Sequence, residues 1–229
     1  VTMVDEGVFK DIDAAMMVHP GAYNSTRMNS LAIDPLEFVF KGKPAHAAAA
    51  PHEGINALDA CIGLFNAVNA LRQHLKPEAR VHGIITEGGV APNIVPERAV
   101  ARFYVRAPGR SYLNEVVEKV KNCARGAALA AGAEVAISHF EFSNDNMRTN
   151  MALAEAFEKN LRSLGVKEIE SPGPGLGSTD IGNVSHVVPA IHASLAIGPR
   201  TLVGHTPEFA RSAVCLLYTS PSPRDRTRS

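Results

Sequence analysis

Cysteine is scarce in this sequence and tryptophan is absent. The 229 residues contain three cysteines, Cys61, Cys123 and Cys215, which lie far apart and form no Cys-x-x-Cys pair. This spacing argues against a disulfide framework and against a thiolate metal site. Few, unpaired cysteines are typical of proteins in a reducing compartment, so we expect a cytoplasmic protein.

Long apolar runs and an excess of one charge are also missing. The longest apolar runs, such as AAMMV and ACIGLF, fall far short of the roughly 20 residues of a membrane-spanning helix, and no basic-then-apolar signal peptide opens the chain. Lys plus Arg and Asp plus Glu both number 23, so the formal net charge is zero. No block of like charge predicts a nucleic-acid or membrane surface. We expect a soluble globular protein that binds neither.

The two ends differ from the rest of the sequence. The chain begins at Val1 and runs straight into a patterned segment, which predicts that part of the parent protein precedes it. Residues 215–229, CLLYTSPSPRDRTRS, change abruptly to a Ser/Pro/Arg mixture without a helix or strand period. Within it, Cys215–Asp225, CLLYTSPSPRD, resembles the translation of a sequencing adapter, and a natural disordered tail is the alternative. We leave these residues out of the fold prediction.

The central part of the chain alternates between strand and helix periods in a recognisable order. Strand periods occur at 31–40, 79–89, 97–108 and 133–142, and helix periods at 54–75 and 111–132. Ser111 is the expected N-cap of the second helix and Gly132 its expected end. The order is β-α-β-β-α-β, which predicts a ferredoxin-like unit, a small sheet with two helices on one face.

The flanks predict a second, α/β part. Strand-like runs at 13–20 and 189–198 enclose a helix at 150–165 and a Gly/Pro-rich loop at 171–183. Since the flanks lie on both sides of the central unit, we expect a small domain inserted into a larger α/β domain. We therefore assign residues 1–29 and 143–214 to a partial α/β domain, 30–142 to the insertion, and 215–229 to a disordered tail.

Two histidines lie where ligands bind in α/β sheets. His19 ends an apolar strand and is followed by Pro20 and Gly21, and His205 lies in VGHTPEF, again just past a strand and a glycine. Taken alone, each is more often a structural residue. Neither belongs to a local metal motif such as HExxH, so a shared ion would require the fold to bring them together.

Three further features are candidates for substrate contacts. The loop GLGSTDIGN offers Ser178, Thr179 and Asp180 among glycines, although a plain Asx or ST turn explains it equally well. Asn93 lies between two prolines, where it either faces a ligand or simply forms the turn. Arg106, near the end of an alternating strand, would pair with a carboxylate or be solvated.

The remaining histidines differ in how informative their surroundings are. His46 is surrounded by alanines and prolines in KGKPAHAAAAP, which leaves free space around its ring. We keep His186 and His192, which flank VVPAI, as secondary candidates near the proposed cleft. The others are interpreted as structural or solvated residues: His52, His74, His82 and His139.

Four segments together resemble the M20 family of metal-dependent peptidases and amidohydrolases. They are FKGKPAHAAAAPHEGINALDA, GGVAPNIVPERAVARFYVR, GSTDIGNVSHVVPAIH and GHTPEF. Within the family, these segments are most similar to the branch of N-acyl-amino-acid amidohydrolases, aminobenzoyl-glutamate hydrolases and some dipeptidases. The resemblance implies a zinc-peptidase-like catalytic domain with an inserted ferredoxin-like lid, or dimerisation, domain, and it implies a homodimer formed through that lid.

The resemblance also implies roles for particular residues. His19 and His205 match metal ligands, and His46 matches a lid histidine that reaches into the neighbouring subunit's site and stabilises an oxyanion. Asn93 and Arg106 match lid positions that hold the substrate, Arg106 through its terminal carboxylate. The loop with Ser178, Thr179 and Asp180 matches a family segment that lines the substrate side of the cleft.

The implied reaction is hydrolysis of an amide bond next to a free carboxylate, in N-acyl amino acids, aminobenzoyl-glutamate or dipeptides. The implied cofactors are two divalent ions, zinc before manganese or cobalt. The family's His-x-Asp motif, bridging Asp and acidic pair would all precede Val1, so we expect the full-length parent to be active and this chain alone to be inactive. The alternative is a non-catalytic ferredoxin-like module for oligomerisation or ligand binding, which explains residues 31–142 equally well.

Overall fold

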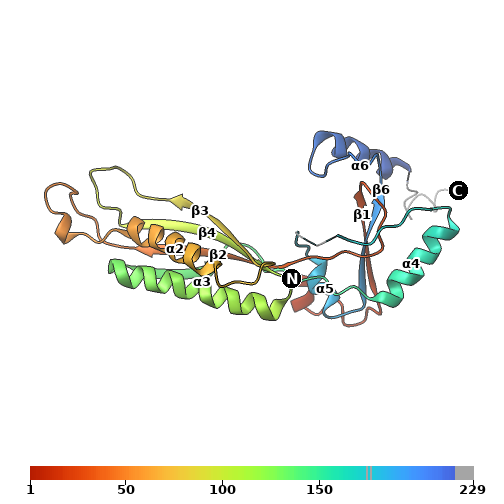
Figure 1. Cartoon of the computed structure of the whole chain (residues 1–229), viewed down its shortest axis with the longest axis horizontal. Coiled ribbons are helices and arrows are strands. Elements are labelled where there is room, and N and C mark those ends of the chain that lie inside the picture. Colours follow the sequence, from red (N-terminus) through yellow and green to blue (C-terminus); the bar gives the residue numbers. More distant parts are fainter. Residues whose placement is uncertain (174, 176, 220–229) are drawn as a thin grey trace. The chain divides into compact units, whose positions relative to one another are not determined.

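A computed structural model describes residues 1–173, 175 and 177–219 of the chain (Figure 1). The chain forms two compact units. The inserted unit contains Leu31–Asn146 together with Gly177–Asp180, and the flanking unit contains Thr2–Ser30 and the other described residues from Met147 onward. Among the described residues, no helix has both the length and the apolar character needed to cross a membrane.

The inserted unit has the predicted ferredoxin-like order. Its strands form one sheet in the order β3-β4-β2-β5, in which every neighbouring pair is antiparallel. The elements are β2 (Ala32–Lys41), the short 3₁₀ helix η1 (Pro51–Glu53), α2 (Ala57–Arg72), β3 (Arg80–Glu87), β4 (Arg98–Ala107), α3 (Arg110–Ala131) and β5 (Glu134–His139). The prediction of a β-α-β-β-α-β unit is thus confirmed.

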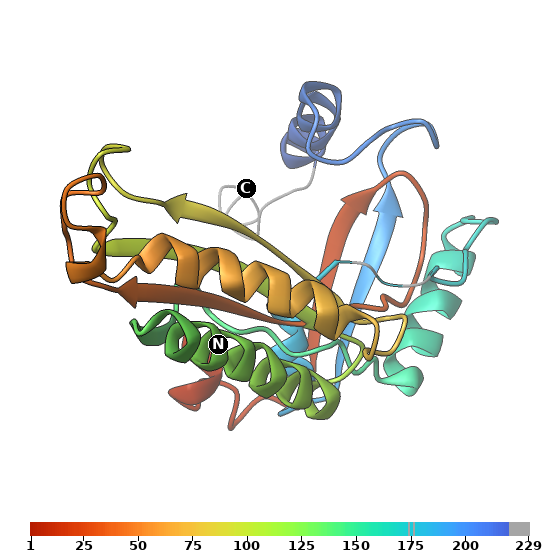
Figure 2. The same cartoon turned by 60° about the vertical axis from the view of Figure 1, so that its left-hand side comes forward.

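Both helices cover the same face of this sheet, as Figure 2 shows, because α2 and α3 each contact β2 and β4. Apolar and polar side chains alternate along the strands, so the apolar ones lie on the sheet face that packs against α2 and α3. In β4, Phe103 and Val105 point into a core that also holds Phe38, Phe40 and Leu64. The face away from the helices is mostly polar, since the intervening positions of β4 carry Arg98, Val100, Arg102, Tyr104 and Arg106.

The helix ends are fixed by side chains, though not all where the sequence predicts. Asn56 caps α2, because its Oδ1 accepts hydrogen bonds from the backbone N–H groups of Leu58 at 2.9 Å and Asp59 at 3.3 Å. The Ser111 N-cap prediction is wrong: α3 begins at Arg110, and its N-cap residue, Gly109, supplies no side-chain bond. The first turn instead uses Asn146 Oδ1, which accepts from the Arg110 N–H at 3.2 Å.

The end of α3 agrees with the prediction. Gly132 has a φ of 70° and its N–H bonds back to the carbonyls of Ala128 and Leu129. This left-handed conformation is the usual way in which a glycine ends a helix.

A charged cluster joins the two ends of the inserted unit. Arg110 donates from Nη1 to Asp34 at 2.7 Å and from Nη2 to Ser143 Oγ at 2.8 Å. Arg110 Nε also pairs with Asp145, and the Ser143 hydroxyl donates to Asp34. Backbone bonds run both ways between Ile33 and Asn144, at 2.8 and 3.0 Å. The entering and leaving segments are therefore held together.

The flanking unit is built on a parallel pair of strands, β1 (Ala15–Gly21) and β6 (Ala190–Ala196), which lie side by side in both ribbon views. Its helices are α1 (Thr2–Asp5), α4 (Met151–Ser163), α5 (Ile181–Ser185) and α6 (Pro207–Thr219). Because the strands are parallel, their carboxyl ends, at Gly21 and Ala196, meet at one edge. Loops that follow this edge are the usual location of ligand sites.

Two segments differ from the sequence prediction. The helix Ile181–Ser185 overlaps the end of the loop expected at 171–183. The backbone of α6 continues to Thr219 and so enters the segment that we expected to be a disordered tail from residue 215. The rest of that predicted tail, residues 220–229, lies outside the described residues.

Candidate metal and substrate site

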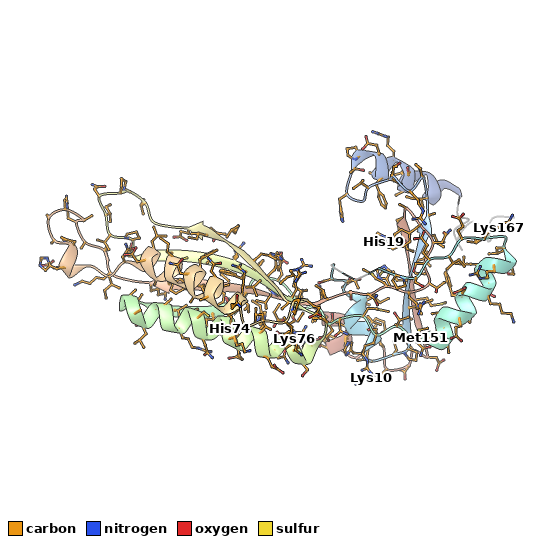
Figure 3. The ribbon with its side chains drawn as sticks, in the orientation of Figure 1. Lys10, His19, His74, Lys76, Met151 and Lys167 are labelled. Atoms are coloured by element: carbon orange, nitrogen blue, oxygen red, sulfur yellow. The ribbon has the colours of Figure 1, made fainter. Side chains whose placement is uncertain are left out.

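His19 lies near the carboxyl end of β1, where Figure 3 labels it. Its Nδ1 lies 2.7 Å from the backbone carbonyl oxygen of Pro20. Since a carbonyl only accepts hydrogen bonds, Nδ1 carries the proton and Nε2 keeps a lone pair. Metal-bound histidines typically have this arrangement, one ring nitrogen bonded to a backbone carbonyl and the other on the ion. The exposed imidazole of His19 therefore fits a divalent metal.

His192 is the neighbour of His19 on β6. Its side chain is buried, and the two ring centroids lie 5.7 Å apart. His192 is a secondary candidate in the sequence analysis. The strand period of 189–198 is the one sequence feature that points to its place in the sheet. His186, the other secondary candidate, lies before β6, at the opposite end of the strand from its carboxyl edge.

His205 lies in the segment that follows β6 and immediately precedes α6. Its φ is 62°, and it is the one non-glycine residue with positive φ in the described part of the chain. Such backbone strain is held where the surrounding structure fixes it, commonly at functional sites. The next residue, Thr206, fixes the start of α6, since its Oγ1 accepts from the Phe209 N–H at 3.2 Å.

Carboxylates do not join these histidines within the described chain. Among the described residues, no group of three or more His, Cys, Asp or Glu side chains is arranged to hold a metal ion. The sharing of metal ions by His19 and His205 therefore stays a prediction. The described residues supply nitrogen ligands and would need acidic partners to complete a dinuclear site.

His46 lies on an exposed loop of the inserted unit that is closed by backbone pairing. Lys43 and Ile55 exchange two N–H to carbonyl bonds of 2.9 Å, next to Gly42. A Cβ at Gly42 would come within 2.1 Å of the Ile55 carbonyl oxygen, so glycine is required for this close approach. The loop therefore has a fixed base.

The ring of His46 is oriented by its own loop. Its Nδ1 accepts from the backbone N–H groups of Ala48 at 3.3 Å and Ala49 at 3.1 Å. A neutral imidazole that accepts at Nδ1 carries its proton at Nε2. The small neighbouring alanines leave that Nε2–H exposed as a donor. The free space that the sequence shows around His46 thus surrounds a pre-oriented hydrogen-bond donor.

Asn93 lies beside His46. Its carbonyl accepts from the Ala47 N–H at 3.0 Å, and His46 forms an isolated antiparallel bridge with Ile94. The Asn93 side chain is exposed. Two residues that the sequence linked only by resemblance are therefore neighbours at one end of the inserted unit.

Arg106 lies at the other end of β4 and contacts the predicted substrate loop. Its Nη1 donates to Ser178 Oγ at 3.3 Å, and its guanidinium carbon lies 5.6 Å from the centre of the Tyr104 ring. Its Nε is buried and has no hydrogen-bond partner among the described residues. Arg106 is therefore not simply solvated, and unused donors remain for an anion.

The rest of the loop continues from Ser178 toward α5. The Gly177 carbonyl accepts from the Leu31 N–H at 2.8 Å, which fixes the start of the loop. Thr179 is half-buried and Asp180 is exposed directly before α5. On β3, His82 lies next to Tyr104, and burial together with the charges of Arg106 and Arg72 lowers the pKa of its imidazole.

The predicted lid residues thus form two separate groups. Arg98 begins β4 close to the His46 and Asn93 loops, whereas Arg106 is the eighth residue beyond it. At the rise of an extended strand, these positions lie about 26 Å apart. A single acyl-amino acid does not bridge that distance, so His46 and Arg106 of one chain do not contact the same small substrate.

The remaining histidines show no arrangement that points to a metal or substrate. His52 is exposed in η1, and His74, labelled in Figure 3, follows the end of α2. His139 ends β5, with Nε2 at 3.8 Å from Asp34 Oδ2. These positions agree with structural or solvated roles.

Known proteins provide a comparison for this arrangement. A family described as "Peptidase dimerisation domain" matches residues 34–131, from Asp34 in β2 to the last residue of α3. The Xaa-Arg dipeptidase of Mus musculus is 39% identical over 226 residues, which is 96% of this chain and 52% of that protein. A component of the p-aminobenzoyl-glutamate hydrolase of Escherichia coli (strain K12) is 36% identical over 171 residues, covering 74% and 35% of the two chains.

A solved structure supports the fold. The aminobenzoyl-glutamate utilization protein from Klebsiella pneumoniae superimposes with a TM-score of 0.72 at 21% identity, covering 94% of this chain and 56% of that one. The chain spans about half the length of the dipeptidases from Mus musculus and Homo sapiens, 52% and 49%. The similarity covers both units. The two sequence relatives, a dipeptidase and a p-aminobenzoyl-glutamate hydrolase, are by their names hydrolases of amide bonds.

Proposed function

Residues 34–131 of this chain are an M20 peptidase dimerisation domain, and from this membership we propose that the full-length protein is a metal-dependent amide hydrolase. Its substrates would be N-acyl amino acids, aminobenzoyl-glutamate or dipeptides, in which the scissile amide lies next to a free carboxylate. The names of the relatives, a dipeptidase and an aminobenzoyl-glutamate hydrolase, support this class of substrate.

We propose that His19 and His205 hold divalent metal ions in the full-length protein. Imidazole suits zinc, and manganese or cobalt are alternatives. Bound metal ions would lower the pKa of a water molecule and polarise the scissile carbonyl. In this scheme His19 binds through Nε2, because its Nδ1 is occupied by the Pro20 carbonyl.

The inserted unit would supply the lid and the dimer interface. The observation that carries this proposal is the separation of two groups within one chain, His46 with Asn93 at one end of β4 and Arg106 with Ser178 at the other. If both groups contact one substrate, one group must come from a second copy of the chain. A homodimer in which His46 and Asn93 enter the partner's site satisfies this requirement.

The proposed roles follow from the atoms that each residue presents. The His46 Nε2–H would donate to the oxygen anion that develops on the scissile carbonyl, with Asn93 beside it. Arg106 would bind the terminal carboxylate through its unused guanidinium donors. The substrate side of the cleft would be completed by Ser178, Thr179 and Asp180.

The competing candidate is a non-catalytic ferredoxin-like module for oligomerisation or ligand binding. The flanking unit argues against it, because His19 and His205 would then be present without a function, and because the relatives are similar across both units. Location in the reducing cytoplasm also stays a prediction, since the free thiols of Cys61 and Cys123 agree with it but are not specific for it.

The experiment that tests the activity uses the full-length protein. Hydrolysis of aminobenzoyl-glutamate and of a panel of dipeptides is measured before and after treatment with a chelator, and after zinc or manganese is added back. We expect the activity to disappear with the metal and to return with it. Hydrolysis that persists in the metal-free protein, or binding without any hydrolysis across the panel, would contradict the proposal.

A further inference from the structure

One face of the β1–β6 pair carries a second histidine that the proposed reaction does not use. In the register of the two strands, Met17 lies opposite His192 and His19 lies opposite Ser194. Paired residues of neighbouring strands point to the same side of a sheet, and side chains two residues apart share a side. These four residues therefore share one face, with His192 diagonal to His19.

The two imidazole rings are close enough to pack on each other. Their centroids lie 5.7 Å apart and their planes are tilted by 49°. Packed aromatic rings in proteins have centroid separations of roughly 4.5 to 7 Å, so this distance is one of contact. The orientation of either ring therefore restricts the other.

The two histidines differ in how firmly they are held. His192 is 6% exposed, and its neighbours in β6, Ile191 and Ala193, are both fully buried. Met17, which lies opposite His192, packs against a small apolar cluster of Met147, Ile181 and Ala190. His19 lies further along the face and is exposed. Because close-packed interiors resist rearrangement, His192 is the fixed member of the pair and His19 the adjustable one.

A single hydrogen bond does not determine the orientation of the His19 ring. The bond from Nδ1 to the Pro20 carbonyl selects the tautomer, but the ring can still tilt about that bond. A metal ligand needs its lone pair to point in one direction, and a packed neighbour supplies the missing restraint. The ring of His192 is buried and lies within packing distance of the His19 ring.

We propose that His192 is a positioning residue for His19. Its ring restricts the tilt of the His19 imidazole and so aims the Nε2 lone pair at the position of the metal ion. This inference rests on the proposed function in one respect, the role of His19 as a metal ligand. Removal of a group that orients a metal-bound histidine typically lowers metal affinity about 10- to 100-fold, which sets the size of the expected effect.

The first experiment follows the His19 ring in the chain without metal. Histidine labelled with ¹⁵N is incorporated into the wild type, His192→Ala and His192→Phe, and the ring nitrogens are observed by NMR at neutral pH; His19→Ala identifies the His19 signals. We expect a single Nδ1–H tautomer in the wild type and in His192→Phe, which keeps a flat ring. In His192→Ala the Pro20 carbonyl still selects this tautomer, and we expect the His19 ring signals to broaden because the ring samples several tilts. His186→Ala is the matched control, because this histidine lies outside the pair.

The second experiment measures zinc affinity in the full-length protein. We expect His192→Ala to weaken zinc binding about 10- to 100-fold and His192→Phe to weaken it far less. The proposal is overturned if His192→Ala leaves the His19 signals and the zinc affinity unchanged, or if His192→Phe behaves like His192→Ala. Should His192→Ala fail to fold, His192→Leu, which fills the volume without a flat ring, replaces it under the same two criteria.

The outcomes separate this inference from the proposed function. If His19→Ala binds zinc as tightly as the wild type, His19 is not a ligand and the proposed function loses its metal site. The NMR comparison would still decide whether His192 orients His19. Conversely, loss of zinc binding in His19→Ala with no effect of His192→Ala supports the metal site and refutes the positioning role.

Discussion

Arg106 and Ser178 are joined by a hydrogen bond of 3.3 Å between the guanidinium Nη1 and the hydroxyl Oγ. The bond ties β4 to the loop at 177–180 and leaves the buried Nε without a partner among the described residues. A buried N–H donor without a hydrogen-bond partner destabilises the folded state. An anion that accepted a hydrogen bond from it would remove this penalty. This arrangement supports the proposal that Arg106 binds the substrate carboxylate.

The first prediction concerns this contact. In the full-length protein, Arg106→Lys should raise the KM for a substrate with a terminal carboxylate and lower kcat/KM roughly 30-fold, because a hydrogen bond to a charged group contributes about 2 kcal/mol. Steady-state kinetics measure the effect. The matched control is Arg102→Lys, on the same strand and face, where the arginine is already paired with Glu37 at 2.8 Å. Equal losses in the two variants would remove Arg106 from the binding site.

The second prediction concerns the charged cluster at the base of the inserted unit. Asp34 and Arg110 have side-chain exposures of 9% and 28%, so Arg110→Met leaves a largely buried carboxylate without its cationic partner, with only the Ser143 hydroxyl bond retained. Removal of one partner of a buried pair costs about 3 kcal/mol of folding stability. Urea unfolding measures it. Arg98→Met, which breaks a half-exposed pair with Glu87, should cost about 0.5 kcal/mol. Similar losses of folding stability in the two variants would show that the Asp34–Arg110 pair contributes no more than an exposed ion pair.

The same cluster predicts a pH dependence of stability. Burial alone would raise the pKa of Asp34, but hydrogen bonds from Ser143 and Arg110 outweigh it and lower that pKa below its usual value. A carboxyl group with a lowered pKa in the folded state stabilises the fold above its unfolded pKa, and this contribution is lost as the pH falls through the folded value. The difference in unfolding free energy between wild type and Asp34→Asn should therefore be full at pH 6 and shrink below about pH 4. A difference that is constant with pH would contradict it.

A further prediction concerns thiol reactivity. Cys61 is fully buried, and burial raises the pKa of its thiol to about 11. Since the thiolate is the reactive form, Cys61 should resist alkylation at pH 8 in the folded chain and react on unfolding. Mass spectrometry of iodoacetamide-treated protein, in a Cys215→Ser background, measures this. Burial also raises the pKa of Cys123, which is partly exposed and should react first. Rapid labelling of Cys61 in native protein would show that α2 is not packed as described.

The sequence is a good guide to the inserted unit because its elements repeat clear periods. The alternation in residues 97–108 and the helical spacing in 111–132 correspond to β4 and α3. The start of α3 differs from the sequence prediction because the bond to its first N–H comes from Asn146, far along the chain. The α6 helix was missed for a different reason: its start signals, the Thr206 cap followed by Pro207, lie in a segment whose glycines and prolines are typical of loops.

The sequence points to single candidate residues of the site, but it does not predict which of them lie next to one another. The positions of His19 and His46 follow from a strand end and from a cluster of small residues. The contact between His19 and His192 depends on the register of two strands that are distant in sequence, which no local pattern encodes. Likewise, the separation of His46 from Arg106 becomes visible only when β4 is known to run between them.

The 229-residue chain by itself is predicted to be inactive. Calorimetric titration with zinc or manganese, and a hydrolysis assay at high protein concentration, test this. Hydrolysis of an acyl-amino acid by the chain with either metal would refute it.

The proposal that His46 acts in the partner subunit's site is tested most directly by mixing two inactive variants of the full-length protein. His46→Ala should keep its metal content but lose activity by about 10²- to 10³-fold, as expected for a lost oxyanion donor, and His19→Ala should lose metal. If His46 acts in the partner's site, a mixed dimer pairs the intact His46 of one subunit with the intact metal site of the other. Exchange of subunits should then restore hydrolysis in up to half of the sites of each mixed dimer. Mixed dimers that form, as seen by native mass spectrometry, but stay inactive would contradict the account and place His46 within its own subunit.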